Sequence, residues 1–249
     1  MFPIRDHNPS QRTPYVTYGL IAINAIVFLV MLPLYGNDAG LSRIYLSYGA
    51  IPVRLTSGQG YETAVTSMFL HGGFMHFAGN MLFLWIFGDN LEDILGHVRF
   101  AVFYLVSGIG ALLLQILADP ASPVPMVGAS GAIAGVMGGY LLLFPKARVD
   151  VLLILVVIFK VIPFPAWLML IIWFGLQVVN GALSLGQTGG GVAHWAHAGG
   201  FIAGLLFVLP VWRSLGGKTF WDRTHGHPDH PEASYSVGKS RIPKVNRRR

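Results

Sequence analysis

Four residues in apolar surroundings carry side chains that could do chemistry together: Ser130, His197, His76 and Asn80. A serine hydroxyl becomes a nucleophile when a neighbouring base accepts its proton, which would make Ser130 the nucleophile and His197 the general base. His76, Asn80 and the backbone amide of Ser130 could donate hydrogen bonds to the oxyanion that such an attack creates. One donor of this kind is worth a factor of about 10² to 10³ in rate. These residue types together predict acyl transfer through a serine nucleophile.

The acidic residues are placed differently from those of a Ser-His-Asp triad. All 11 lie in tails, in loops or at the ends of apolar segments. A catalytic Ser130 would therefore work in a Ser-His dyad, and a residue other than Asp would have to orient His197. A structural alternative is open as well, because Ser130 lies in the glycine-rich run GASGAIAGVMGGY (128–140). Serine is common where membrane helices pack closely.

Two further functions could use the same polar residues. The histidines could bind a metal ion within the membrane: His71, His76, His194 and His197. However, the H-E-x-x-H pattern of zinc proteases is absent and no carboxylate is near to complete a site. A channel or carrier is the other alternative, but the two halves show no convincing repeat and acidic proton-relay residues are missing.

The composition is that of a polytopic membrane protein. Of the 249 residues, 53% are hydrophobic and 11% are charged, against roughly 25% charged in soluble domains, and the mean hydropathy is +0.58. The chain has no cysteine, which excludes disulfides, thiolate metal sites and a cysteine nucleophile. The polar N-terminal tail, 1–14, has no cleavable signal pattern, so we expect the first apolar run to be a membrane span.

The apolar runs set the number of spans, since a span needs about 20 largely apolar residues. Six stretches qualify: 15–34, 66–87, 98–117, 127–144, 165–184 and 193–212. A seventh stretch, 149–162, is short, flanked by basic residues and rich in β-branched residues, so an interfacial or hairpin segment is the alternative there. The sequence thus predicts an all-α bundle of six membrane helices over 15–212.

The basic residues predict the orientation of this bundle. With six spans, every Lys and Arg except Arg43 and Arg54 falls on one side of the membrane. An excess of Lys and Arg marks the cytoplasmic side, so we expect both termini in the cytoplasm and the plasma (inner) membrane as the location. The polar C-terminal tail, 213–249, is expected to be disordered. Its final arginines are expected to contact anionic membrane lipids and not nucleic acid.

The spacing of polar and small residues predicts how the spans meet. His76 and Asn80 are four residues apart and share one helix face, and they are expected at a depth similar to that of Ser130 and His197, in the outer half of the membrane. Glycines four residues apart predict close approach of the fourth and sixth spans: Gly131, Gly135, Gly139, Gly200 and Gly204. Other polar residues within spans are Asn24, Gln115, Gln177 and Asn180.

Three motifs in this order resemble the rhomboid family of intramembrane serine proteases. They are HGGFMHFAGNMLFLWIFGDNLEDILGHVRF at 71–100, GASGA at 128–132 and AHAGGFIAG at 196–204. The resemblance covers roughly residues 65–210. It implies the six-helix rhomboid fold, Ser130 as nucleophile, His197 as general base, and His76, Asn80 and the Ser130 amide as oxyanion donors. It also implies supporting roles for His71, Gly128 and Gly131, with a helix-end histidine facing lipid head groups as the alternative for His71.

The resemblance further implies the reaction and its partners. The chain is expected to hydrolyse peptide bonds in or beside transmembrane segments of single-span or other membrane proteins, with small residues at the cleavage position and without a cofactor. Glu92 is expected to fix loop structure. Many relatives carry an aromatic residue four positions after the nucleophile, packed on the catalytic imidazole, where this sequence has Ala134. The alternative function is a non-catalytic relative that binds transmembrane clients without cutting them.

Overall fold

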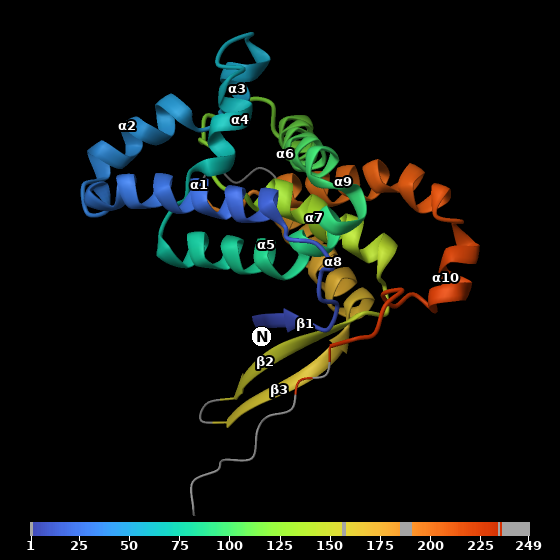
Figure 1. The fold of residues 1–249 in the computed structure, drawn as a ribbon. Coiled ribbons are helices and arrows are strands. Elements are labelled where there is room, and N and C mark those ends of the chain that lie inside the picture. Colours follow the sequence, from blue (N-terminus) through green and yellow to red (C-terminus); the bar gives the residue numbers. More distant parts are fainter. Residues whose placement is uncertain (1, 156–157, 185–190, 234, 236–249) are drawn as a thin grey trace, which may run out of the picture.

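The chain forms a bundle of apolar helices with a small sheet beside it (Figure 1). The computed structural model describes residues 2–155, 158–184, 191–233 and 235. Within these ranges a helix lies at each of the six expected positions, and the bundle helices are α1 (Tyr15–Met31), α5 (Phe74–Leu95), α6 (His97–Ala118), α7 (Ser130–Leu143), α8 (Ala166–Leu183) and α9 (His194–Ser214). Shorter elements join α1 to α5: η1 (Leu32–Leu34), α2 (Asp38–Tyr48), α3 (Pro52–Thr56), α4 (Thr63–Thr66) and η2 (Ser67–Phe69).

Helix α7 lies at the centre of the bundle and packs against α5, α6, α8 and α9. Nearly all its side chains are buried although it is only 14 residues long. Its closest neighbour is α9, because small residues let the two backbones touch. A methyl group added at Gly200 would overlap the carbonyl oxygen of Gly131, and one added at Gly204 would overlap that of Gly135. The predicted close approach of these two spans is confirmed.

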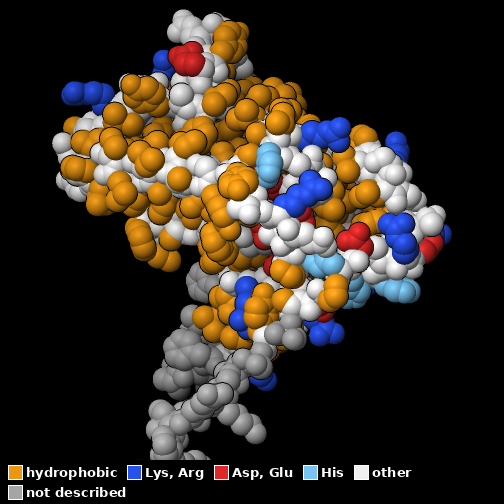
Figure 2. All heavy atoms as spheres, viewed as in Figure 1, with side chains coloured by type: hydrophobic (Ala, Val, Ile, Leu, Met, Phe, Trp, Pro, Cys, Tyr) orange, Lys and Arg blue, Asp and Glu red, His pale blue; other side chains and the backbone are white. Residues whose placement is uncertain are grey.

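The outer helices present apolar side chains to their surroundings. Four helical segments in the described part of the chain are long and apolar enough to cross a membrane: Tyr15–Leu34, His97–Ala118, Ala166–Leu183 and His194–Ser214. On α1, Ile26 is 61% exposed and Val30 is 73% exposed. Figure 2 shows such side chains covering α1 and α5, while charged side chains gather at the end where α10 (Lys218–Thr224) and β1 (Phe2–Asp6) lie.

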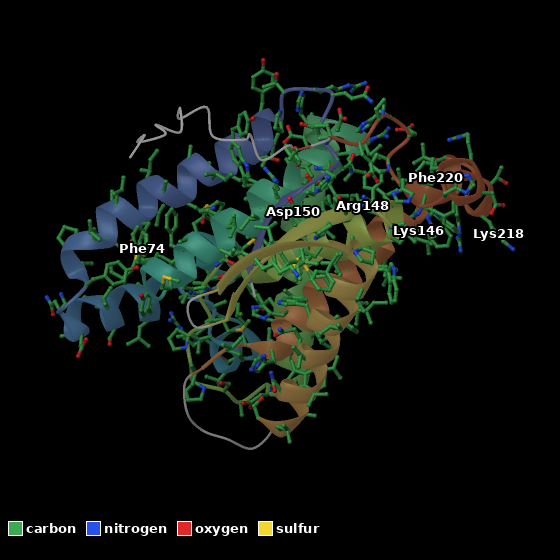
Figure 3. The ribbon with its side chains drawn as sticks, turned by 90° about the horizontal axis from the view of Figure 1, so that it is seen from below. Phe74, Lys146, Arg148, Asp150, Lys218 and Phe220 are labelled. Atoms are coloured by element: carbon green, nitrogen blue, oxygen red, sulfur yellow. The ribbon has the colours of Figure 1, made fainter. Side chains whose placement is uncertain are left out.

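The charged end lies opposite the start of α5. In the view from below (Figure 3), Phe74 lies at one end of the molecule, whereas Lys146, Arg148 and Lys218 lie toward the other end. These three basic residues are among those expected on the cytoplasmic side, and that orientation stays a prediction.

The second span begins later than predicted. The expected limits were 66–87, but α5 runs from Phe74 to Leu95. The segment before it, up to Gly73, forms short helical turns and a bend. At its other end, Gly96 has a φ of 75° and by itself joins α5 to α6, a left-handed conformation that glycine adopts without a steric penalty.

The stretch 149–162 is a β-hairpin, the alternative that its β-branched residues suggested. Strand β2 (Arg148–Leu155) pairs antiparallel with β3 (Ile158–Pro165), so the chain leaves and re-enters the bundle at the same end. Strand β1 pairs antiparallel with β2, giving the order β1-β2-β3 with an irregularity between Pro3 and Arg5. The sequence did not predict this third strand. The N-terminal tail supplies it because its first residues meet the free edge of the hairpin.

The expected disorder of the C-terminal tail is wrong for its first part. Helix α9 continues to Ser214, and α10 packs back on the bundle, where Trp221 Nε1 donates to the carbonyl of Leu142 over 3.0 Å. The Lys146 amide donates to the carbonyl of Gly226 over 2.8 Å. Backbone and indole groups of the tail thus find partners on the bundle. The rest of the expected disorder, 236–249, lies outside the described residues.

Buried Glu92 ties the end of α5 to the start of α1. Its carboxylate is 1% exposed and accepts hydrogen bonds from the amides of Val16 and Thr17 at 2.8 and 2.7 Å. It also accepts from the Thr17 hydroxyl at 2.7 Å and from His97 Nδ1 at 2.5 Å. The first amides of a helix have no partner within the helix, so this carboxylate caps α1 from outside. The structural role expected for Glu92 is confirmed.

Candidate active site

The candidate site lies where the N-terminal ends of α5, α7 and α9 meet. Ser130 is the first residue of α7, His197 is the fourth of α9, and His76 and Asn80 are the third and seventh of α5. The later start of α5 places His76 within one turn of the helix end. All four predicted residues thus lie within the first two turns of their helices. Ser130, His197 and His76 remain partly exposed, so a substrate can reach them.

Ser130 and His197 are in direct hydrogen-bond contact. Ser130 Oγ lies 2.7 Å from His197 Nε2, within the range of a good O–H···N bond. The glycine contacts between α7 and α9 bring the two side chains together, since Gly131 and Gly200 touch just below this pair. A hydroxyl beside an imidazole nitrogen is the arrangement that activates a serine nucleophile.

The sequence left open which group orients the His197 ring. Two side chains of helix α8 contact this ring. His197 Nδ1 lies 2.9 Å from Gln177 Oε1, and the Trp173 ring lies 5.8 Å from the His197 ring, centroid to centroid, at 33° between planes. Ala134 is fully buried inside the bundle. Thus the indole of Trp173, and not a side chain on α7, packs beside the imidazole. Sequence reasoning missed Trp173, whereas Gln177 had a signal as a polar residue inside a span.

His76 presents an N–H toward Ser130. The Gly72 amide donates to His76 Nδ1 over 3.2 Å, so the ring proton is on Nε2. Gly128 lies against this edge of the ring, and a Cβ at Gly128 would be 2.8 Å from His76 Nε2 and 3.5 Å from Ser130 Oγ. Gly128 also has a φ of 131°, which other residues rarely adopt. A glycine at this position therefore leaves room between the imidazole and the hydroxyl.

Asn80 and the Ser130 amide are further free donors in this region. Asn80 is 8% exposed, and no hydrogen-bond partner reaches its Nδ2 among the residues that the structure describes. Buried amide groups normally have partners, so this unpaired NH₂ is a donor that could bond a ligand. Ser130 is the first residue of α7, where backbone N–H groups have no partner within the helix.

His71 lies behind His76. It is 1% exposed, and its ring meets the His76 ring at 5.2 Å in an edge-on arrangement. The hydroxyls of Tyr35 and Tyr45 donate to its carbonyl oxygen over 2.7 and 2.9 Å. The alternative of a helix-end histidine facing lipid head groups is wrong, because the side chain is buried.

The four histidines that suggested a metal site make ring contacts in two pairs. His71 contacts His76, and His194 contacts His197. Over the described ranges, no three His, Cys, Asp or Glu side chains come together in a way that could hold a metal ion. The geometry gives the metal alternative no support.

A small cavity of about 50 Å³ adjoins Ser130. Its wall is made mainly of small or apolar residues: Ala50, Met68, Gly108, Ala111, Met126, Gly128, Gly131, Ala132, Ala193 and Ala196.

Comparison with known proteins identifies a family over most of this bundle. The Rhomboid domain matches residues 57–214. The chain is 32% identical over 200 residues to "Rhomboid protein 1, mitochondrial" of Saccharomyces cerevisiae, covering 77% of this chain and 52% of the yeast protein. It is 33% identical over 128 residues to "Rhomboid protease GluP" of Bacillus subtilis, covering 51% of this chain and 24% of that protein. The chain thus spans about half or less of the length of these relatives.

Proposed function

Since the chain belongs to the rhomboid family and is a multi-pass membrane protein, we propose that it is a serine endopeptidase that cleaves transmembrane proteins. The relative from Bacillus subtilis is named a protease, which supports proteolysis as the activity of the family. The single observation that carries the proposal is the 2.7 Å contact between Ser130 Oγ and His197 Nε2. We assign the catalytic domain to residues 15–212.

The reaction proceeds through an acyl-enzyme. His197 Nε2 takes the proton as Ser130 Oγ attacks the carbonyl carbon of the scissile bond, and the resulting oxyanion accepts hydrogen bonds from the Ser130 amide, His76 Nε2 and Asn80 Nδ2. His197 then gives the proton to the leaving amine. A water molecule, deprotonated by His197, hydrolyses the ester and restores Ser130. General acid–base help of this kind is worth a factor of about 10² to 10⁴ in rate.

The substrate is a membrane protein whose transmembrane segment unwinds next to Ser130. A peptide bond inside a helix is shielded, so the segment must be extended before the hydroxyl can reach its carbonyl. Unpaired backbone groups in the membrane need polar partners, which favours cleavage close to the outer surface where water enters. The cavity of about 50 Å³ beside Ser130 favours a small residue at the cleavage position.

We place the protein in the plasma (inner) membrane with both termini in the cytoplasm. The start of α5 near the site and the basic residues Lys146, Arg148 and Lys218 lie toward opposite ends of the molecule (Figure 3). Because basic residues favour the cytoplasmic side, the site opens to the outer side.

The proposal is tested with purified protein in liposomes that contain a tagged single-span substrate with Gly and Ala in its transmembrane segment. Ser130→Ala and His197→Ala are expected to abolish cleavage and labelling by a fluorophosphonate. The matched control is Ser214→Ala, because this exposed serine donates to the Val211 carbonyl within its own helix, away from the site. Cleavage should persist in this control and in the presence of a chelator.

Each other outcome identifies a different error. Cleavage that survives Ser130→Ala would refute the serine mechanism, and cleavage that is lost with the chelator would favour a metal site. If the wild type neither cuts several substrates nor takes the label, the non-catalytic client-binding function becomes the better proposal.

A further inference from the structure

On the side away from Ser130, the His197 ring contacts a polar side chain of α8. Gln177 Oε1 lies 2.9 Å from His197 Nδ1 and also 2.9 Å from His194 Nδ1. Gln177 is 9% exposed on a helix that otherwise carries mostly apolar side chains. A polar side chain at this depth is costly unless it has partners or a function.

The position of Oε1 decides which nitrogen of His197 carries the proton. A carbonyl oxygen accepts hydrogen bonds through two lone pairs and donates none, so both imidazole Nδ1 atoms donate to it. A neutral His197 with its proton on Nδ1 has a free lone pair on Nε2, and that lone pair faces Ser130 Oγ. Only this tautomer can take the serine proton.

We propose that Gln177 is a positioning residue that fixes the tautomer and ring orientation of His197, with His194 as the second donor that holds the Gln177 amide. The inference rests on the proposed serine mechanism. Gln177 thereby takes the orienting part of the role that an Asp has in a Ser-His-Asp triad, without supplying a negative charge.

The neighbourhood of His197 leaves this role to Gln177. The titratable side chains that face His197 are His194 on its own helix and His76 on α5. Helix α7 contributes Ser130, and the Gln115 side chain on α6 accepts from the Ala196 amide over 3.2 Å. Trp173, one turn before Gln177 on α8, packs beside the ring but offers it no acceptor.

The test compares two substitutions at one position. Gln177→Met keeps the length and removes the acceptor, so kcat should fall about 10- to 100-fold with KM near that of the wild type. This loss is smaller than the about 10⁴-fold effect of a wrong tautomer in a triad enzyme, because no charged partner is lost. Gln177→Glu keeps an acceptor oxygen and should restore most of the activity.

The pH profile separates positioning from simple packing. In Gln177→Glu the new carboxylate lies next to Nδ1 and favours the protonated ring, so the acidic limb of the kcat profile should move to higher pH. A packing role would leave this limb in place. Asn180→Leu is the matched control, because Asn180 is an exposed amide on the same helix; it should keep the wild-type kcat and profile.

The outcomes distinguish this inference from the proposed function. If Ser130→Ala is inactive while Gln177→Met keeps the wild-type kcat and pH profile, the positioning role is refuted and the serine mechanism stands. If Ser130→Ala still cleaves, the proposed function itself fails. Should Gln177→Met not fold, the acidic limb of Gln177→Glu decides the question, and an unmoved limb overturns the inference.

Discussion

The contact between α7 and α9 gives a sharp test of how the fold builds the site. Gly200 lies one turn after His197, and a Cβ at this position would overlap the carbonyl oxygen of Gly131, the residue that follows Ser130. A Cβ atom essentially never comes closer than 3.0 Å to a heavy atom outside its own and the neighbouring residues. The substitution Gly200→Ala must therefore push the two helices apart at the level of the dyad.

The size of this displacement sets the expected effects. A Cβ at Gly200 would lie 1.9 Å from the Gly131 oxygen and ordinary contact begins at 3.4 Å, so the backbones must separate by about 1.5 Å. The same shift would lengthen the 2.7 Å distance between Ser130 Oγ and His197 Nε2 to about 4.2 Å, beyond hydrogen-bond range. The general-base contribution at stake is a factor of about 10² to 10⁴ in rate. Overpacking costs about 1–3 kcal/mol of stability, against which the helix preference of Ala over Gly offsets about 1 kcal/mol.

The assay measures cleavage of the single-span substrate in liposomes and the melting temperature in detergent. The control is Gly175→Ala on α8, where an added Cβ meets nothing within 4 Å. This control should cleave at the wild-type rate and melt at the same or a slightly higher temperature. Wild-type cleavage and melting in Gly200→Ala would refute the reasoning that close contact of α7 and α9 assembles the dyad.

Three further substitutions test other parts of the molecule. Asn80→Ala removes an unpaired buried donor, so kcat should fall about 10²- to 10³-fold while the melting temperature stays near that of the wild type; a large drop in melting temperature would contradict this. Glu92→Gln should lower stability by about 1–3 kcal/mol, because an amide NH₂ replaces an acceptor of α1 amides, and kcat of the folded enzyme should be unchanged. Burial, and then the charge of Asp89, raises the pKa of Asp6 to about 8 from its ordinary 3.8. The contribution of Asp6 to stability is therefore full below about pH 4 and is lost as the pH rises to about 8. The melting temperature of the wild type should therefore fall between pH 5 and pH 9 more than that of Asp6→Asn, and equal slopes would contradict the shift.

The sequence could single out the candidate site residues because polar side chains are conspicuous in apolar spans. Ser130, His197, His76 and Asn80 were identified by type and position, and the structure brings Ser130 and His197 into contact. The start of the second span was wrong because 66–70 is apolar enough to extend a hydropathy window. Hydropathy does not register that Gly72 and Gly73 stop the helix from starting earlier.

The missing parts are contacts between segments distant in the chain. Gln177 was visible as a polar residue in a span, but its pairing with His197 depends on how α8 packs against α9. Trp173 gave no signal, since an aromatic residue in a span is ordinary. The third strand was missed because β1 needs the edge of a hairpin that begins at Arg148, far along the sequence.

The two ends of α5 carry buried polar groups in different hydrogen-bonding states. At one end, each oxygen of buried Glu92 accepts hydrogen bonds within the protein, so the carboxylate fixes α1 on α5. At the other end of the same helix, the Asn80 amide is buried with an unpaired NH₂ among the described residues. A satisfied buried group stabilises the folded state, whereas an unsatisfied one costs stability until a ligand bonds to it. Helix α5 thus anchors the bundle at its C-terminal end and keeps a free donor at its N-terminal end, where an oxyanion next to Ser130 can become its partner.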